Sequence, residues 1–144
     1  MAAGYSGTPL PQKLGIRAGS RVALVRAPVG FAGLDSLPDG VRLRTQARGA
    51  QDVVVFFATR LAELERRFDS FARAVEPAGG LWIAWPKKTA GVATDLTENV
   101  VRDVGLAHGL VDNKVCAVDD TWSGLRFVYR LRDRAARHQP TKTR

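Results

Sequence analysis

One segment near the middle of the chain constrains the fold more than any other. Residues 52–58 form a continuous apolar run, which is typical of a parallel strand covered on both faces. In residues 61–75, apolar side chains recur at spacings of three and four, which indicates an amphipathic helix. Residues 81–85 form a second apolar run. A strand, a helix and a strand in this order predict a right-handed βαβ crossover.

Shorter patterns extend this unit on both sides. Residues 21–26 and 41–45 precede it as β-rich segments, and residues 114–118 and 125–131 follow it. The sequence therefore predicts an α/β fold with a single Rossmann-like sheet of about six mostly parallel strands. We expect a C-terminal antiparallel hairpin and helices on both faces of the sheet.

The 144-residue length fits one domain, which we expect to span residues 21–131. Residues 1–20 are interpreted as an extended leader packed on this domain. Residues 132–144 are interpreted as a basic tail that is disordered or forms a frayed helix.

Local signals predict where the helices begin and end. Thr59 is a candidate N-cap for the helix over residues 61–75, and Pro77 with Gly79–Gly80 is expected to end that helix.

Two further helices are expected. A brief one is predicted over residues 31–37. Another is predicted after Asp95 and Glu98, which have the spacing of a capping box, and it should end near Gly109.

The fold class places a candidate ligand site. In an open parallel sheet, ligands bind beyond the carboxyl ends of the strands, where the strand order reverses. In the segment after the first strand, residues 27–33, Gly30 and Gly33 are the only glycines. The third glycine of a dinucleotide site is missing, and so is the acidic residue expected about 20 residues later. These motifs do not support a nucleotide cofactor, and the two glycines favour a plain loop.

Basic residues at the following strand ends suggest an anionic ligand. Lys87 and Lys88 follow the strand over residues 81–85, and Thr59 and Arg60 follow the strand over residues 52–58. The two sides together could neutralise a phosphate or carboxylate, but the residues alone favour the plainer explanation of a solvated basic loop. The candidate ligand-binding set is therefore Gly30, Gly33, Thr59, Arg60, Lys87 and Lys88.

No pattern predicts a catalytic or metal-binding group. Cys116 lies in an apolar strand, where a cysteine usually acts as a small hydrophobe, and His108 lies at a helix end. Asp119 and Asp120 adjoin in a turn, where aspartates usually cap the backbone. One cysteine and two histidines do not make a zinc site.

The charge of the chain is concentrated at one end. The formal net charge is +8, of which +5 lies in residues 130–144. This tail could follow a nucleic-acid backbone, but it lacks aromatic residues for stacking on bases, so solubilisation or docking of a protein partner is an equal alternative. The apolar runs are shorter than the roughly 18 residues of a membrane span, and no signal peptide is apparent. We expect a cytoplasmic protein that does not bind membranes.

Four segments resemble a family of actinobacterial proteins of unknown function. They are GYSGTPLP (residues 4–11), GLWIAWPKK (80–88), TDLTE (94–98) and VDNKVCAVDDTWSG (111–124). The resemblance implies a cytoplasmic protein of a high-GC Gram-positive bacterium and implies no activity.

More distantly, the order of the elements resembles the core of class I S-adenosylmethionine (SAM)-dependent methyltransferases. With strands numbered along the chain, the resemblance implies the sheet order 2-1-3-4-6-5. Residues 21–33 lack the acidic-Gly-x-Gly loop of that family, the second strand lacks its ribose-binding acid, and one strand–helix unit is missing. SAM binding is therefore not supported by motifs, and no methyltransferase residues are assigned.

The leading hypothesis is a non-catalytic binding or regulatory module that acts through its strand-end site or through a protein partner. The alternative is a reduced SAM-dependent methyltransferase or another small-ligand transferase. Nucleic-acid binding through the basic tail ranks third.

Overall fold

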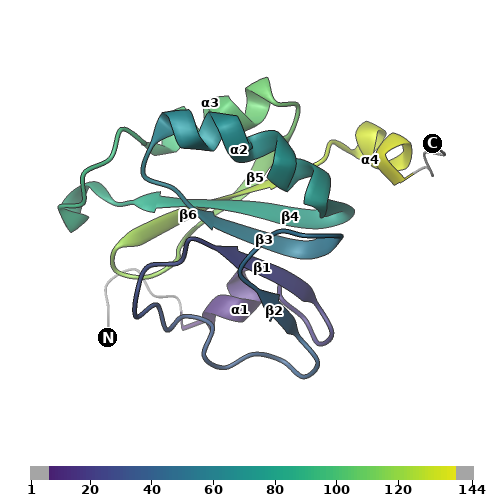
Figure 1. Cartoon of the computed structure of the whole chain (residues 1–144), viewed down its shortest axis with the longest axis horizontal. Coiled ribbons are helices and arrows are strands. Elements are labelled where there is room, and N and C mark those ends of the chain that lie inside the picture. Colours follow the sequence, from purple (N-terminus) through teal and green to yellow (C-terminus); the bar gives the residue numbers. More distant parts are fainter. Residues whose placement is uncertain (1–6, 139–144) are drawn as a thin grey trace.

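A computed structural model describes residues 7–138 of the chain, with side chains through Arg134. The helices are α1 (Leu10–Lys13), α2 (Leu61–Ala74), the 3-10 turn η1 (Lys88–Ala90), α3 (Glu98–Ala107) and α4 (Leu131–His138). The strands are β1 (Arg21–Val25), β2 (Arg42–Arg44), β3 (Gln51–Phe57), β4 (Val75–Pro86), β5 (Val111–Ala117) and β6 (Trp122–Val128). The elements pack as layers of helix and sheet (Figure 1).

Within residues 7–138, six strands form one sheet in the order β2-β1-β3-β4-β6-β5. Strands β2, β1, β3 and β4 pair in parallel, and β6 runs antiparallel to both of its neighbours. This confirms the predicted fold class, the strand order and the C-terminal antiparallel hairpin. The strand order reverses between β1 and β3, because β2 lies on one side of β1 and all later strands lie on the other.

The β3–α2–β4 unit forms as its apolar pattern predicts. Phe56 of β3 and Leu64, Phe68 and Phe71 of α2 are buried in one apolar cluster. The rings of Phe56 and Phe71 lie 4.7 Å apart between centroids. Full burial of a side chain of this size contributes about 1.5–3 kcal/mol, so the packing of α2 on the sheet is a main source of stability.

The end of α2 differs from the prediction. The helix ends at Ala74, and Val75 already pairs with Gln51 of β3 as the first residue of β4. Pro77 and Gly79–Gly80 therefore lie within β4 and do not end the helix. The pairing of Val75 with β3 decides the boundary, because the backbone of Val75 is already extended, with φ −83° and ψ 132°, and continues into the sheet.

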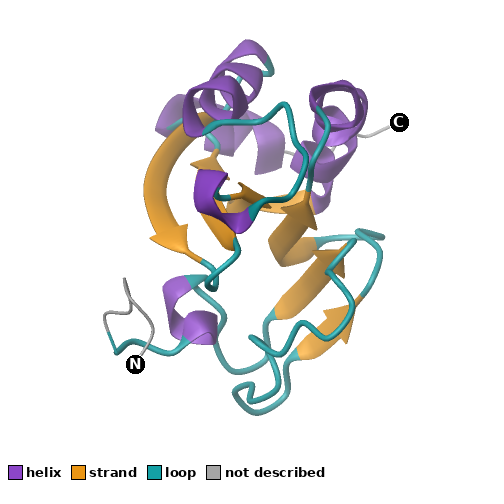
Figure 2. Cartoon of the chain, turned by 90° about the vertical axis from the view of Figure 1, so that its left-hand side faces the viewer, coloured by secondary structure: helices purple, strands orange, loops and turns teal. Residues whose placement is uncertain are grey.

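Apolar side chains cover both faces of the sheet. Helices α2 and α3 lie on one face, and α1 lies on the other together with coil segments (Figure 1, Figure 2). Leu14, Ile16 and Leu34 of these coil segments are buried beside Trp82 of β4. The Trp82 indole N–H donates a hydrogen bond to the Leu14 carbonyl at 3.1 Å, which satisfies a buried donor. The prediction of helices on both faces is thus confirmed.

Residues 31–37 form no helix, which corrects the sequence-based prediction. At Gly33, a Cβ atom would lie 2.5 Å from Leu10 Cδ2 and 2.7 Å from Phe31 Cζ. Leu34 is only 6% exposed. The apolar side chains of this segment therefore fold onto the sheet as coil, which a regular helix at this place would not allow.

The sequence predicts that Thr59 caps the N-terminus of α2, and this prediction is wrong. Arg60 occupies the N-cap position, and its side chain makes no capping hydrogen bond. Instead, Asp95 Oδ1 accepts a hydrogen bond from Leu61 N at 2.8 Å. The hydroxyl of Thr94 donates to the Thr59 carbonyl at 2.7 Å, which holds Asp95 in place at the end of β3.

The capping box predicted for Asp95 and Glu98 is consequently absent. Helix α3 is capped by Thr97, whose hydroxyl accepts a hydrogen bond from Val100 N at 3.2 Å. The prediction that this helix ends near Gly109 is confirmed by the positive φ of 93° at that residue.

The chain beyond β6 continues into α4, which covers part of the segment interpreted as a tail. Residues 139–144 of that segment, like residues 1–6 of the leader, lie outside the described residues. None of the helices described between residues 7 and 138 has the length and apolar character needed to cross a lipid bilayer.

Candidate functional site

The carboxyl ends of β1 and β3 mark the switch point, which is the place where the strand order reverses. Open α/β sheets bind their ligands at this place. In Figure 2 the molecule is seen from the side of η1, the short helix that follows β4. The residues that follow β1 and β3 decide whether the switch point is open.

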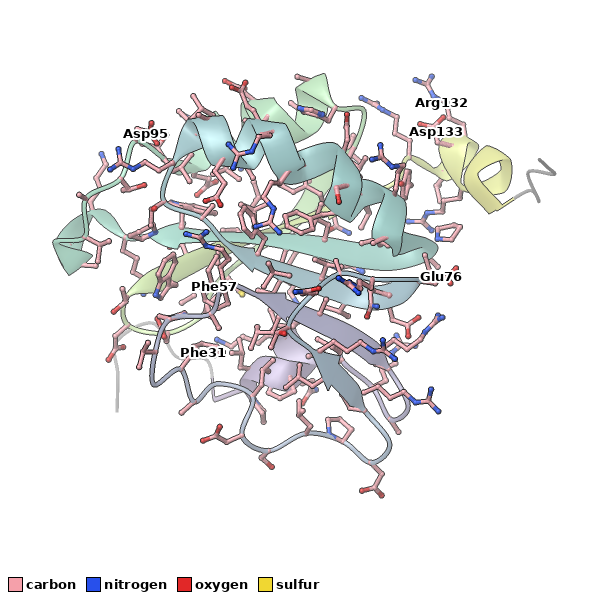
Figure 3. All side chains as sticks on the ribbon, viewed as in Figure 1. Phe31, Phe57, Glu76, Asp95, Arg132 and Asp133 are labelled. Carbon is pink, nitrogen blue, oxygen red and sulfur yellow. The ribbon has the colours of Figure 1, made fainter. Side chains whose placement is uncertain are left out.

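Phe31 and Phe57 close the switch point from the α1 face. Phe31 lies in the loop after β1 and Phe57 is the last residue of β3. Their ring centroids are 5.1 Å apart at an interplanar angle of 66° (Figure 3). Trp122 at the start of β6 contacts Phe57 edge-on, also at 5.1 Å. A row of three aromatic side chains therefore crosses the strand ends.

Arg26 and Glu63 connect the same two strand ends on the α2 face. Arg26 follows β1 directly and has a φ of 62°, which is uncommon for a residue with a side chain. Its Nη1 atom donates to Oε2 of Glu63, in the first turn of α2, at 3.0 Å. The switch point is thus bridged by an ion pair on one face and by an aromatic contact on the other.

The predicted site residues separate into two groups. Gly30 and Gly33 line a pocket of about 620 Å³. Thr59 offers its carbonyl to Thr94, and Lys87 donates its backbone N–H to the Thr121 carbonyl at 2.8 Å.

Arg60 and Lys88 are exposed, and Lys87 is half-buried. Among the described contacts, none joins these three cations, and none of them lines the pocket that Gly30 and Gly33 line. The anion site proposed for them from the sequence stays a prediction.

The pocket next to Gly30 and Gly33, called the loop pocket below, lies between the N-terminal segment and two strand ends. Its walls come from the start of α1, from the loop after β1 and from the turn after β5. The lining residues are Gly7, Thr8, Pro9, Leu10, Lys13, Gly30, Phe31, Ala32, Gly33, Val118 and Asp119. Most of this lining is apolar, and Lys13 and Asp119 supply one charge of each sign.

The two charged residues of the loop pocket are also held by the backbone. Lys13 Nζ donates to the Ala117 carbonyl at 3.3 Å. Asp119 Oδ1 accepts hydrogen bonds from Thr121 N at 2.9 Å and from Trp122 N at 2.8 Å. The prediction that Asp119 caps a turn is therefore confirmed, and both side chains are fixed in position.

A second pocket of about 640 Å³ shares Thr8 and Lys13 with the loop pocket and reaches Cys116. Burial raises the pKa of the Cys116 thiol, and the charges of Lys13 and Lys114 oppose this shift only in part. The thiol is therefore protonated at neutral pH and is a poor nucleophile.

The other candidate groups for catalysis are also engaged elsewhere. His108 Nδ1 lies 2.6 Å from Asp69 Oδ1, across the contact between α3 and α2. Within the described part of the chain, no three His, Cys, Asp or Glu side chains gather as a metal site.

The sequence did not single out Phe31, Leu10 or Asp119 as pocket residues. Phe31 could have been identified from the sequence, because a large aromatic side chain between two loop glycines is expected to pack against neighbouring apolar residues. Leu10 carried none, since its contact with the loop after β1 depends on the course of the whole N-terminal segment.

Comparison with known proteins shows a relationship of fold only. No protein-family model matches the sequence, and no curated protein matches it either. Among solved structures, the chain is similar to a DhpI–SAH complex, with a TM-score of 0.59 and 14% identity over 85% of this chain and 83% of that chain.

Two further similar structures point the same way. Magnesium protoporphyrin IX methyltransferase from Synechocystis PCC 6803 with bound SAM matches at a TM-score of 0.55 and 13% identity, over 78% of this chain and 71% of that one. A putative methyltransferase from Thermoplasma acidophilum matches at 0.55 and 11% identity, over 86% and 75%. The fold therefore resembles that of SAM-dependent methyltransferases.

The residues at the switch point do not fit a SAM molecule bound there. Phe31 and Phe57 occupy the strand ends, and residues 31–37 provide no helix N-terminus to face a carboxylate. The end of β2 carries Arg44, Thr45 and Gln46 where an acid would hold a ribose. The aromatic contact and the basic and polar end of β2 together oppose SAM binding in the usual place.

Proposed function

We propose that this chain is a non-catalytic binding module with a methyltransferase-like fold, and that its ligand is a small, mainly apolar molecule held in the loop pocket. One observation carries the proposal. The switch point is bridged by Phe31–Phe57 and Arg26–Glu63, while an apolar pocket of about 620 Å³ lies directly beside it. Small-molecule sites usually have volumes of about 300–1,000 Å³ and a mostly apolar lining with a few polar groups.

The lining defines the chemistry of the ligand. Phe31, Leu10 and Val118 suit an aromatic or branched aliphatic body, which would bury their apolar surface. Lys13 and Asp119 are held by backbone contacts and can fix a ligand that carries a polar group at one end. The raised pKa of the Cys116 thiol supports binding without a nucleophilic step.

A regulatory role through a protein partner is part of the same proposal. Val29 lies at the tip of the loop after β1 and is fully exposed, one residue from the glycine that lines the pocket. A ligand that orders this loop would also fix Val29 as a contact for a partner.

The second candidate is a reduced SAM-dependent methyltransferase. The shared strand order and the similarity to structures solved with SAM or S-adenosylhomocysteine favour it. This function requires Phe31 to leave Phe57, so that the switch point opens. Nucleic-acid binding through residues 132–144 has weaker support, because these residues include no aromatic side chain that could stack on bases.

The two candidates are distinguished by NMR titration of the labelled protein. The probes are a set of small aromatic amines and carboxylates, and SAM and S-adenosylhomocysteine in a parallel series. We expect saturable shifts of the Leu10, Gly30 and Gly33 amides with members of the first set. Saturable binding of SAM, with shifts at Phe31 and Phe57, would instead support the methyltransferase.

A matched pair of variants locates the binding. Ala32→Trp places a large side chain on the pocket lining, whereas Val29→Trp places it at the exposed loop tip. Ala32→Trp should weaken binding by at least about tenfold, and Val29→Trp should leave it unchanged. Equal affinities of both variants would contradict the assignment of the loop pocket.

A further inference from the structure

A further cleft lies near the amino-terminal ends of β1 and β3, away from the switch point. It has a volume of about 250 Å³ and is called the basal cleft below. Its lining includes Ser20 just before β1, Asp52 near the start of β3 and Glu76 near the start of β4. Figure 3 shows Glu76 on the right of the view and Phe31 and Phe57 left of its centre. The basal cleft is therefore separate from the loop pocket.

Arg126 of β6 lines the basal cleft and has an unusual environment. Its guanidinium is half-buried, and it forms no ion pair with any carboxylate of the described residues. Its Nη1 atom donates to Asn113 Oδ1 at 3.4 Å. Burial, with a smaller effect from the charge of Arg134, lowers the pKa of Arg126. A charge that is partly removed from water without a counter-charge costs stability.

Of the two adjacent glycines in β4, Gly80 makes room for this arginine. At Gly80, a Cβ atom would lie 2.4 Å from Arg126 Nε and 2.9 Å from its Cζ. At Gly79, a Cβ atom would lie 2.5 Å from the Asp52 carbonyl. Glycine weakens a strand interior and often marks a place where a ligand or another group approaches the backbone closely. Here Gly80 lets the Arg126 side chain lie on β4, whereas Gly79 lets β4 approach the backbone of Asp52 in β3.

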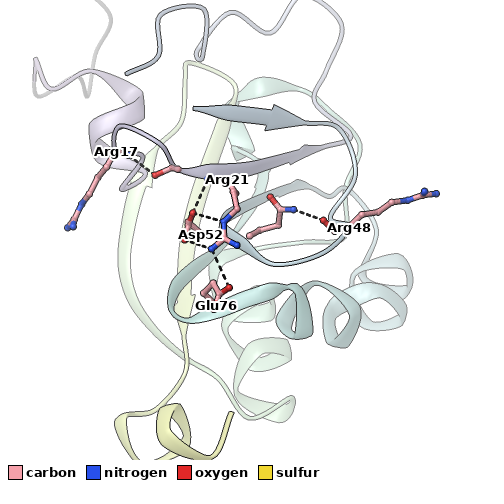
Figure 4. A network of polar contacts seen from close by, with 7 residues as sticks. Arg17, Arg21, Arg48, Asp52 and Glu76 are labelled. Atoms are coloured by element: carbon pink, nitrogen blue, oxygen red, sulfur yellow. Dashed lines mark hydrogen bonds and ion pairs between the residues drawn. The ribbon is translucent and has the colours of Figure 1, made fainter. Parts of the chain in front are cut away.

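Both acids of the basal cleft are already paired with one arginine, Arg21. Arg21 donates to Asp52 through Nε at 3.2 Å and through Nη2 at 3.1 Å, and Nη2 also donates to Glu76 at 3.3 Å (Figure 4). The backbone N–H of Arg21 donates to Asp52 Oδ2 at 2.8 Å as well. These two carboxylates therefore balance Arg21 rather than Arg126.

A further cation stands at the mouth of the basal cleft. Arg17 lines it, and its exposed side chain extends away from Arg21 (Figure 4). The backbone of Arg17 is fixed by a hydrogen bond from its N–H to Ser20 Oγ at 2.9 Å. The lining residues Arg17 and Arg126, together with Arg21, which pairs with the lining acids, give three positive charges against the two negative charges of Asp52 and Glu76. The formal charge around the cleft is therefore positive.

We propose that the basal cleft binds the phosphate group of a small phosphorylated molecule, with Arg126 as its principal ligand and Arg17 closing over it. A guanidinium matches phosphate oxygens with two parallel N–H donors, which is the pairing that Arg126 lacks within the chain. The volume of about 250 Å³ leaves room for a small organic group attached to the phosphate.

The test is an NMR titration of the full chain with inorganic phosphate and with phenyl phosphate, against sodium chloride at equal ionic strength. We expect saturable shifts of the Ser20, Gly79 and Gly80 amides with both phosphates and none with chloride. Absence of saturable shifts with either phosphate would overturn the proposal. Because these amides lie away from the loop pocket, the outcome is independent of the proposed function.

Variants of equal charge separate specific binding from a general charge effect. Arg126→Met keeps the aliphatic stem and should weaken phosphate binding by at least about tenfold. Arg66→Met, on the exposed surface of α2, removes the same charge and should change the affinity less than about twofold. Equal weakening by both variants would overturn the proposal.

Gly80→Ala provides a second variant that leaves all charges in place. Its methyl group displaces the Arg126 side chain, so phosphate binding should be lost while the circular dichroism spectrum is unchanged.

A single-stranded oligonucleotide serves as a third probe. Binding of the oligonucleotide without binding of either phosphate would show that the basal cleft is not a small-ligand site.

Discussion

Phe31 and Phe57 meet edge to face across the ends of β1 and β3, with ring centroids 5.1 Å apart. The contact occupies the position at which sheets of this strand order hold their ligands. In this chain, whose fold resembles that of SAM-dependent methyltransferases, two of its own side chains therefore fill that position. The loop pocket lies beside this contact. Phe31 both fills the switch point and lines the pocket.

Replacement of Phe31 tests this role. Phe31→Ala should lower the free energy of unfolding by about 1–2 kcal/mol, because the aromatic contact is lost from a half-buried side chain. Urea denaturation measures the change. Val29→Ala, at the exposed tip of the same loop, should change stability by less than about 0.5 kcal/mol. Equal free energies of unfolding for the two variants would mean that the Phe31 ring does not stabilise the loop after β1.

Capping of α2 from a distant segment gives a second prediction. Asp95→Ala should destabilise the protein by about 1 kcal/mol, because it removes both the acceptor for Leu61 N and a negative charge at a helix N-terminus. Thr59→Ala should cost less than about 0.5 kcal/mol, since the Thr59 hydroxyl does not cap the helix. If Thr59→Ala lowered the free energy of unfolding more than Asp95→Ala in urea denaturation, Thr59 would be the cap instead.

The Arg21–Asp52 pair predicts a dependence of stability on pH. Hydrogen bonding by Arg21 lowers the pKa of Asp52 below its ordinary value of 3.8. A carboxyl group with a depressed pKa in the folded state stabilises the protein above its unfolded pKa, and this contribution is lost as the pH falls through the folded pKa. The wild type should therefore exceed Asp52→Asn in stability by a constant amount from pH 7 to about pH 5. Below pH 3.8 the difference should shrink.

The size of this effect is limited by exposure. The side chains of Arg21 and Asp52 are 41% and 38% exposed, so solvent screens the pair and we expect at most about 1 kcal/mol at low salt. Urea denaturation at several pH values measures it, and added salt should reduce it. A difference that grows toward low pH would contradict the assignment.

The stability of the Arg126 variant gives a fourth prediction. Arg126→Met should leave the free energy of unfolding unchanged or raise it by up to about 1 kcal/mol, because the change removes a partly desolvated charge that lacks an ion-pair partner. Thermal unfolding without phosphate measures this, with Arg66→Met as the reference of equal charge. A loss of more than about 1 kcal/mol specific to Arg126→Met would indicate that the side chain serves the fold.

Periodicity predicted the elements but not all of their boundaries. The apolar runs and the three-four spacing around Phe68 placed β3, α2 and the core of β4, because each pattern is local and faces one hydrophobic layer. The junction at Ala74 and Val75 was missed, since it depends on how Gln51 pairs across the sheet. Residues 31–37 were assigned to a helix because the apolar spacing alone did not reveal contacts with Leu10.

The sequence by itself determined the α/β class and the absence of the dinucleotide and SAM motifs, because hydrophobic periodicity and glycine spacing are properties of short segments. The strand order was implied only by the resemblance of the element order to the core of class I SAM-dependent methyltransferases. Only the tertiary structure decided how the strand ends are closed and where the open pockets lie. Phe31 on Phe57, Asp95 at Leu61 and Arg126 on Gly80 each join residues far apart in the chain. Such contacts arise from packing of the whole sheet, and no local pattern encodes which side chains it brings together.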